Sequence, residues 1–210
     1  MRSFVSCLFA FLTVVAFAQT PEEILNRMSE VWDTHEPEGL IMTVDTKFPV
    51  VGTISMKNYS LGNKTRSETT KMGIHIVVWD DGVTSYSYTE KTNKVKIEDS
   101  VVEDASENGD TELFTDVTEG YDLSIKKETA DSWLILCQKS KSNPDKDAPK
   151  KVEITVAKGT FYPMSLKTKM EGMSLTMRDI SFGVKEDFVT FRMEDYPNAI
   201  VEDKRDKGNK

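Results

Sequence analysis

The chain has 210 residues, of which 38% are hydrophobic and 30% charged, and its formal net charge is −8. This length can bury one sizeable core, so a single domain is expected. Nucleic-acid binding is disfavoured as a function, because no basic stripe offsets the repulsion between this acidic chain and phosphates.

The first eighteen residues have the three parts of a secretory signal peptide. Arg2 supplies the positive end, residues 4–17 form an apolar run, and Ala16 and Ala18 provide the small side chains that a signal peptidase accepts. The run is too short to span about 30 Å of hydrocarbon comfortably, and Cys7 lies too early to be the acylated cysteine of a lipoprotein signal. We therefore expect cleavage after Ala18 and a soluble, exported mature protein.

A helix is predicted directly after the cleavage site. Thr20 and Glu23 can form a capping box, and Pro21 suits the first helical position. One apolar stripe follows, made of Ile24, Leu25, Met28, Val31 and Trp32. This helix, which residues 35–39 end, needs an apolar surface to lie against.

Most of the remaining chain alternates between apolar and polar residues with a period of two. This pattern predicts antiparallel strands with one apolar and one wet face. It occupies residues 40–48, 53–57, 85–88, 95–97, 121–125, 152–156, 164–170, 173–177 and 188–193. The segments Ile74–Trp79 and Trp133–Cys137 are continuously apolar, so we expect them to be covered on both faces.

Three stretches interrupt the alternation. Residues 98–110 are acidic and predict a loop that leads into a short helix near Leu113 and Phe114. Residues 140–151 predict a polar loop between two strands, and residues 204–210 predict a charged, disordered tail. No domain boundary or internal repeat is visible.

The sequence contains no clear catalytic constellation. His35 and His75 lack partners at metal-ligand spacing, and there is no nucleophile elbow, glycine-rich phosphate loop or Cys-x-x-Cys motif. Cys137 is the one cysteine of the mature chain, which excludes an intramolecular disulfide and favours a buried, inert thiol. We therefore expect no enzyme activity, metal or cofactor.

Methionines are unusually frequent on the apolar faces of the predicted strands. Two interpretations remain open at this point. The thioethers could fill an ordinary core, or they could form an adaptable surface for variable apolar ligands. In the second case, a strongly bent sheet with an incompletely filled concave face would hold a lipid. The methionines concerned are Met42, Met56, Met164, Met170, Met173 and Met177.

Over nearly its whole mature length the chain resembles the periplasmic outer-membrane lipoprotein carriers (LolA-like, lipoprotein-sorting proteins). The order and spacing of several motifs carry the resemblance: Ile76–Gly82, Tyr86-Ser87-Tyr88, Asn93-Lys94-Val95, Phe188–Phe191, Pro197, Ile200-Val201 and Asp203. One strand departs from the family pattern. Arg66 and Glu68 match it, but Thr65 and Ser67 replace aromatic residues, so part of the expected cavity wall is polar.

The resemblance implies a mainly β fold in residues 19–203: a half-open, strongly bent antiparallel β-sheet (an incomplete barrel) with short helices covering its concave apolar face. The expected cavity lining is Met42, Val44, Ile54, Met56, Tyr86, Tyr88, Met164, Leu166, Met170, Met173, Leu175 and Met177. The expected lid is Leu25, Met28, Trp32, Leu113 and Phe114.

The function implied by the resemblance is that of a monomeric periplasmic carrier. It would bind the acyl chains of lipoproteins or related lipids and move them from an inner-membrane release complex to an outer-membrane acceptor. Two alternatives stay open: a sensor or protein-binding module of the same fold, and an envelope hydrolase.

Overall fold

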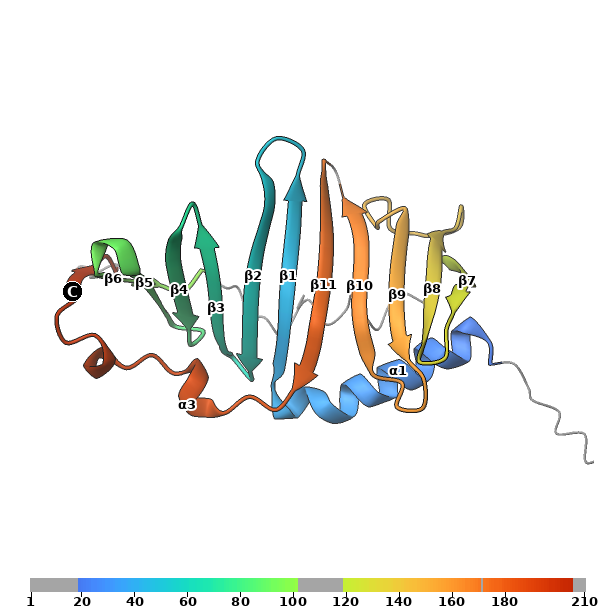
Figure 1. Cartoon of the computed structure of the whole chain (residues 1–210), viewed down its shortest axis with the longest axis horizontal. Coiled ribbons are helices and arrows are strands. Elements are labelled where there is room, and N and C mark those ends of the chain that lie inside the picture. The colour runs from blue at the N-terminus through green and yellow to red at the C-terminus, as the bar shows by residue number, and fades with distance from the viewer. Residues whose placement is uncertain (1–18, 102–118, 171, 206–210) are drawn as a thin grey trace, which may run out of the picture.

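The computed structural model describes residues 19–101, 119–170 and 172–205. The predicted signal peptide 1–18, the predicted lid residues Leu113 and Phe114, and residues 206–210 of the predicted tail lie outside these ranges. Twelve strands form one sheet in the order β12-β6-β5-β4-β3-β2-β1-β11-β10-β9-β8-β7 (Figure 1). The edge strands β12 and β7 are not paired with each other, so the sheet is half-open, as predicted.

All strand pairs are antiparallel except β12 with β6, which is parallel. The helices are α1 (Pro21–His35) and α3 (Glu186–Val189), with short 3-10 turns at Glu36–Glu38, Glu90–Thr92 and Met193–Asp195. The strands are β1 (Leu40–Phe48), β2 (Gly52–Leu61), β3 (Lys64–Lys71), β4 (Ile74–Asp80), β5 (Thr84–Thr89), β6 (Lys94–Asp99), β7 (Tyr121–Glu128), β8 (Ser132–Lys139), β9 (Lys151–Ala157), β10 (Pro163–Met170), β11 (Met173–Phe182) and β12 (Ile200–Asp203).

The predicted N-terminal helix is confirmed as α1, and its capping box is complete. The backbone N–H of Glu23 donates to Oγ1 of Thr20 at 3.2 Å, and the N–H of Thr20 donates to Oε2 of Glu23 at 3.1 Å. These bonds satisfy two donors that a helix start otherwise leaves free. The stripe residues that α1 buries are Ile24, Leu25, Met28 and Trp32.

One predicted strand is wrong. The aromatic alternation over residues 188–193 does not form a strand; this stretch follows the short helix α3 and leads into a 3-10 turn. It has no neighbouring strand to pair with, because it crosses over the sheet as part of a C-terminal segment that we define as residues 184–203. Phe188 and Phe191 instead place their rings against aromatic residues of β2, β4 and β5.

The strand register separates two faces of the sheet, because directly paired residues of antiparallel neighbours project to the same side. Met42 on β1 is paired with Asn58 on β2, whereas its neighbour Ile41 is paired with Tyr59. We call the side that carries Met42 face A and the side that carries Tyr59 face B.

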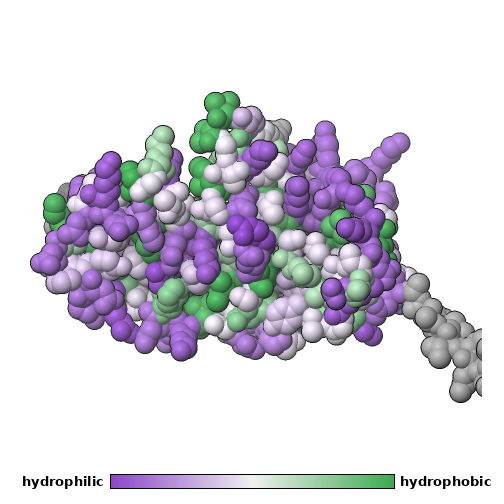
Figure 2. All heavy atoms as spheres, in the orientation of Figure 1, coloured by the Kyte–Doolittle hydropathy of each residue, from purple (hydrophilic) through white to green (hydrophobic). Residues whose placement is uncertain are grey.

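Each face is covered over a different half of the sheet. On face A, α1 crosses β11 to β7 near one end of the strands (Figure 1). The main hydrophobic core lies beneath it and comprises Ile24, Leu25, Met28, Trp32, Leu40, Met42, Trp133, Ile135, Cys137, Val152, Ile154, Val156, Leu166 and Met177. On face B, the C-terminal segment covers β2 to β6, and buried Tyr59, Val77, Trp79, Val95 and Val189 lie outside the first core. The surface seen in the same orientation is mainly hydrophilic (Figure 2).

This arrangement accounts for the two continuously apolar segments. In Ile74–Trp79, Val77 and Trp79 are buried on face B, and the alternate residues are half-buried on face A. In Trp133–Cys137, the odd-numbered residues are buried beneath α1, while Leu134 and Leu136 are only half-buried. The second segment is therefore fully covered on one face, not on both.

Candidate functional site

The floor beneath α1 contains three of the predicted lining residues. Leu166 of β10 is paired with Met177 of β11, and both are buried, as is Met42 of β1. Trp32, near the C-terminal end of α1, packs edge-on against Phe182 with ring centres 5.5 Å apart. The described residues of the predicted lid, Leu25, Met28 and Trp32, thus lie on this floor and close it from solvent.

An apolar strip continues on face A beside the floor. Val44 is paired with both Met177 and Met56, so it links the floor to β2. The strip runs over three adjacent strands, β2, β1 and β11, and all of its side chains are half-buried. We define the apolar strip as Val44, Ile54, Met56, Met173 and Leu175.

Four predicted lining residues lie elsewhere. Met164 sits at an irregularity in the pairing of β10 with β9 and is 47% exposed. Met170 is exposed at the end of β10, where it is paired with Met173. Tyr86 and Tyr88 project from face B, since Tyr86 is in register with Trp79. The two tyrosines therefore do not share a surface with the methionines of face A.

Beyond β2, face A becomes polar. Ser67 on β3 is paired with Asn58 on β2, and its hydroxyl donates to the Asn58 side-chain oxygen at 2.7 Å. Thr65 lies two residues away on the same face. The departure from the LolA-like pattern therefore falls on the face that carries the apolar strip. It gives the strip one polar border.

Face B carries an aromatic cluster that the sequence analysis did not assemble. Tyr86 stacks on Phe191 and Tyr88 packs against Tyr196, each with ring centres 4.4 Å apart. Burial raises the pKa of the Tyr196 hydroxyl. The sequence signal for this cluster was the series of aromatic residues between positions 188 and 196. Because this stretch forms no strand, its rings pack instead against aromatic side chains of the sheet.

Arg66 lies within this cluster and joins the sheet to the C-terminal segment. Its guanidinium carbon is 4.0 Å from the centre of the Phe188 ring and 5.2 Å from that of Trp79. An ion pair with Glu68 at 2.7 Å balances its charge. A half-buried guanidinium over aromatic faces gains cation–π stabilisation, so Arg66 holds the C-terminal segment in place.

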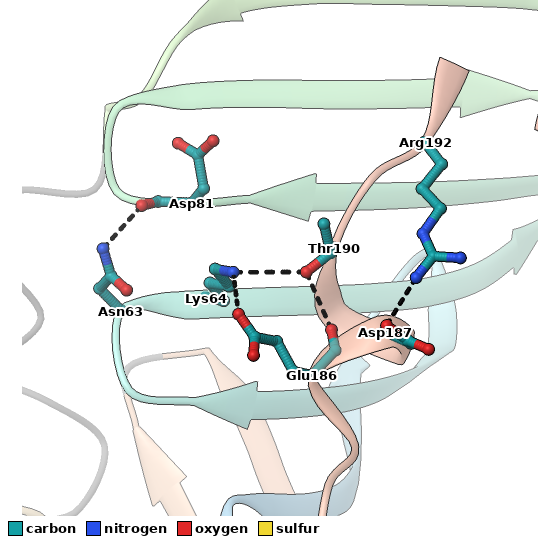
Figure 3. A network of polar contacts seen from close by, with 7 residues as sticks. All are labelled: Asn63, Lys64, Asp81, Glu186, Asp187, Thr190 and Arg192. Atoms are coloured by element: carbon teal, nitrogen blue, oxygen red, sulfur yellow. Dashed lines mark hydrogen bonds and ion pairs between the residues drawn. The ribbon is translucent and has the colours of Figure 1, made fainter. Parts of the chain in front are cut away.

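A polar network fastens α3 to the end of β3 (Figure 3). The Lys64 ammonium donates to Oε1 of Glu186 at 2.7 Å and to Oγ1 of Thr190 at 3.4 Å. This ammonium group lowers the pKa of the Glu186 carboxyl. Arg192 pairs with Asp187 at 2.5 Å within the same segment. This network and Arg66 therefore both hold the C-terminal segment on face B.

The remaining reactive and polar groups of the described residues complete the description of the surface. Cys137 is a buried free cysteine, as predicted, and burial raises the pKa of its thiol to about 12. Across the described ranges, no three His, Cys, Asp or Glu residues come together as a metal site. A surface depression of about 290 Å³ on face B is polar and does not suit an acyl chain; it is lined by Ser55, Lys57, Glu68, Thr69, Thr70 and His75. In the part of the chain that the structure describes, no helix has the length and apolarity needed to cross a membrane.

A half-open, mainly antiparallel sheet with one long helix over an apolar face defines an open β-barrel fold. The chain has a LolA-like fold. It is similar to the lipoprotein LppX of Mycobacterium tuberculosis, with a TM-score of 0.52 and 16% identity over 76% of this chain and 94% of that chain.

Two further structures resemble it more weakly. LprF of Mycobacterium bovis has a TM-score of 0.46 and 10% identity, over 80% of this chain and 96% of that one. A LolA superfamily protein of Nitrosomonas europaea has a TM-score of 0.32 and 11% identity, over 84% of this chain and all of that one. No protein-family model matches the sequence, and no curated protein matches it. At these identities the likeness is one of fold.

Proposed function

We propose that this chain is a periplasmic carrier that binds acyl chains of lipoproteins or related lipids on face A and carries them towards the outer membrane. The observation that supports this function best is the apolar strip, which extends the buried floor into a half-covered surface on three adjacent strands. Covering such a surface with an acyl chain contributes roughly 0.8 kcal/mol per buried methylene.

Helix α1 is the element that suits a movable cover. Four apolar side chains of α1, Ile24, Leu25, Met28 and Trp32, lie in the core with face A, and the His35 ring at its end stacks on Phe182 with ring centres 5.5 Å apart. Apolar contact is not directional, so an acyl chain can replace part of this contact surface while the sheet keeps its hydrogen bonds. A carrier has to release its cargo. If the acyl chain replaces apolar contacts of α1 with face A, the free energies of the loaded and the empty protein stay close, and the cargo can leave.

The polar border gives the bound lipid a direction. Asn58, Thr65 and Ser67 lie next to the apolar strip on face A and present hydroxyl and amide groups. The ester or headgroup end of the cargo would hydrogen-bond there, because burying those groups against the strip without partners is costly. The acyl end would extend over β1 and β11.

The test begins with the mature protein purified from its own envelope and examined by native mass spectrometry for co-purifying lipid or lipoprotein. Binding of a fluorescent fatty acid is then measured for Met56→Asp, which charges the strip, and for Thr53→Asp as matched control. Thr53 is an exposed residue of the same strand on face B, where it is paired with Lys47. We expect Met56→Asp to lose the probe and Thr53→Asp to keep it.

Two results would overturn the proposal. One is the absence of both co-purifying lipid and fatty-acid binding in the unmodified protein. The other is equal binding by both variants, which would place the probe away from face A. Either result would favour the interpretation of the domain as a sensor or protein-binding module.

A further inference from the structure

Three hairpin turns form one end of the central part of the sheet. They join β1 to β2, β3 to β4 and β10 to β11. The six strands are consecutive in the sheet, in the order β4-β3-β2-β1-β11-β10, and alternate in direction, so their turns point the same way. These turns lie together at the top of Figure 1.

Each of these turns exposes large apolar side chains. Val50 and Val51 of the first turn are 95% and 69% exposed, Met72 of the second is 94% exposed, and Met170 at the third is 44% exposed. Apolar side chains project beyond the β1–β2 turn in Figure 2. We define these four residues as the apolar rim. Exposed apolar groups gathered at one end of a molecule mark an interaction surface.

The backbone at Met72 supports a functional reason for its side chain. Met72 has a φ of 53°, in the left-handed region where asparagine and glycine are favoured and long side chains are uncommon. A methionine held there with its side chain almost fully in water gains nothing from packing. The position therefore favours a role outside the fold.

A lysine precedes every rim turn. Lys47, Lys71 and Lys169 are all exposed. The register places Lys47 and Lys169 on either side of Ser174, on three adjacent strands. Within the described ranges none of the three ammonium groups forms an ion pair, whereas Lys64, Lys94 and Lys126 do. The rim therefore combines apolar tips with three lysines that form no ion pair with a described residue, in a chain of net charge −8.

The neighbouring turns at this end differ. Among the described residues of the Glu90–Thr92 turn and the 140–150 loop, no large apolar side chain is exposed. At this end of the strands, the exposed large apolar side chains of the described residues lie on these three adjacent hairpins, apart from Ile200 at the start of β12, which is 62% exposed beside Lys94. Three separate tips at one end of the sheet fit a surface better than a peptide, which would need a continuous groove or a free strand edge.

We propose that the apolar rim docks the protein on a lipid bilayer that contains anionic headgroups. The valines and methionines would enter the headgroup region, and the three lysines would contact anionic lipids at its surface. Because the remainder of the chain is acidic, this rim is the end that an anionic membrane attracts. The inference goes beyond the proposed carrier function and does not depend on face A binding an acyl chain.

The test is flotation of the mature protein, residues 19–210, with protein-free vesicles of phosphatidylcholine alone or with added phosphatidylglycerol. The rim variant combines Val50→Ser, Val51→Ser and Met72→Asn, the last of which suits a left-handed backbone. The control is Val83→Ser, because Val83 is 74% exposed in the β4–β5 turn at the opposite end of the strands. A second variant replaces Lys47, Lys71 and Lys169 with glutamine.

We expect the unmodified protein and Val83→Ser to float with the anionic vesicles, more weakly as salt is raised. The rim variant should lose at least four-fifths of the bound fraction. The lysine variant should bind anionic and neutral vesicles equally. Circular dichroism confirms that each variant is folded.

Three results would overturn the inference: no flotation of the unmodified protein, equal flotation of the rim variant, or binding only to native membranes that contain protein, which would assign the rim to a protein partner. Measuring fatty-acid binding on the same proteins distinguishes failure of the membrane-docking inference from failure of the proposed carrier function. A protein that binds the fatty acid but does not float would refute the docking surface alone, and one that floats without binding the fatty acid would refute the carrier function alone.

Discussion

Replacing Trp32 with alanine should release α1 from face A without unfolding the sheet. Trp32 is buried and packs edge-on against Phe182, with ring centres 5.5 Å apart. Truncating a buried tryptophan to alanine typically costs about 3–5 kcal/mol. If the substitution weakens the packing of α1 on face A by about 3 kcal/mol, the population with α1 displaced rises roughly a hundred-fold. Each 1.4 kcal/mol changes an equilibrium constant by a factor of about ten.

Cys137 provides the assay, because it lies in the same core as Trp32 and is the one cysteine of the expected mature chain. In the closed state its thiol is buried with a pKa of about 12, so almost no reactive thiolate is present at pH 8. Once exposed, the thiol regains an ordinary pKa of about 8.5 and reacts with a thiol reagent. The labelling rate therefore reports how often α1 leaves face A.

We expect Trp32→Ala to speed Cys137 labelling about a hundred-fold, while Glu30→Ala, at an exposed position of α1, leaves the rate unchanged. Added fatty acid should alter the labelling rate of the unmodified protein. The reasoning is refuted if labelling rises only as much as the urea midpoint predicts for global unfolding, because α1 and the sheet would then open as one unit.

Three further outcomes follow from local contacts. Thr20→Ala removes the α1 cap and should lower the free energy of unfolding by about 1 kcal/mol in urea melts; no change would mean that the helix start contributes nothing. Lys126 and Lys151 hold the pKa of Glu153 at about 2, below its ordinary value of 4.5, so its stabilisation is present above pH 4.5 and is lost as the pH falls towards 2. Glu153→Gln should flatten the pH dependence of stability in that window, and an unchanged slope contradicts the assignment. Arg66→Ala removes the cation from the aromatic cluster and should speed tryptic cleavage of the C-terminal segment, whereas cleavage at the unmodified rate would show that Arg66 does not hold it.

Local patterns were sufficient to predict α1 and most strands. The Thr20–Glu23 capping box and the apolar stripe act within one helix, and a period of two fixes which side chains of one strand share a side. The half-open sheet and the polar position of Ser67 followed from the resemblance to LolA-like proteins and from the departure from it.

Alternation cannot predict how the faces of different strands match. Tyr86 and Met42 have the same period, but their strands are four positions apart in the sheet, and the register of each intervening pair decides the face. The cover of face B was missed for the same reason: Phe188 and Arg66 are far apart in the sequence and meet only through the tertiary fold. Residues 188–193 alternate like a strand, but they cross face B and place Phe188 and Phe191 on its aromatic rings instead of pairing with an edge of the sheet.

The placement of α1 and the C-terminal segment on opposite faces separates two mechanical roles. The half-sheet from β2 to β6 has its own buried residues on face B, fastened by Arg66 and by the Lys64–Glu186 contact. When α1 moves, this half loses no packing, so it can act as a rigid frame from which the other half opens and to which it returns. Under the proposed carrier function, the empty protein would then keep its shape between deliveries and need no refolding before its next cargo.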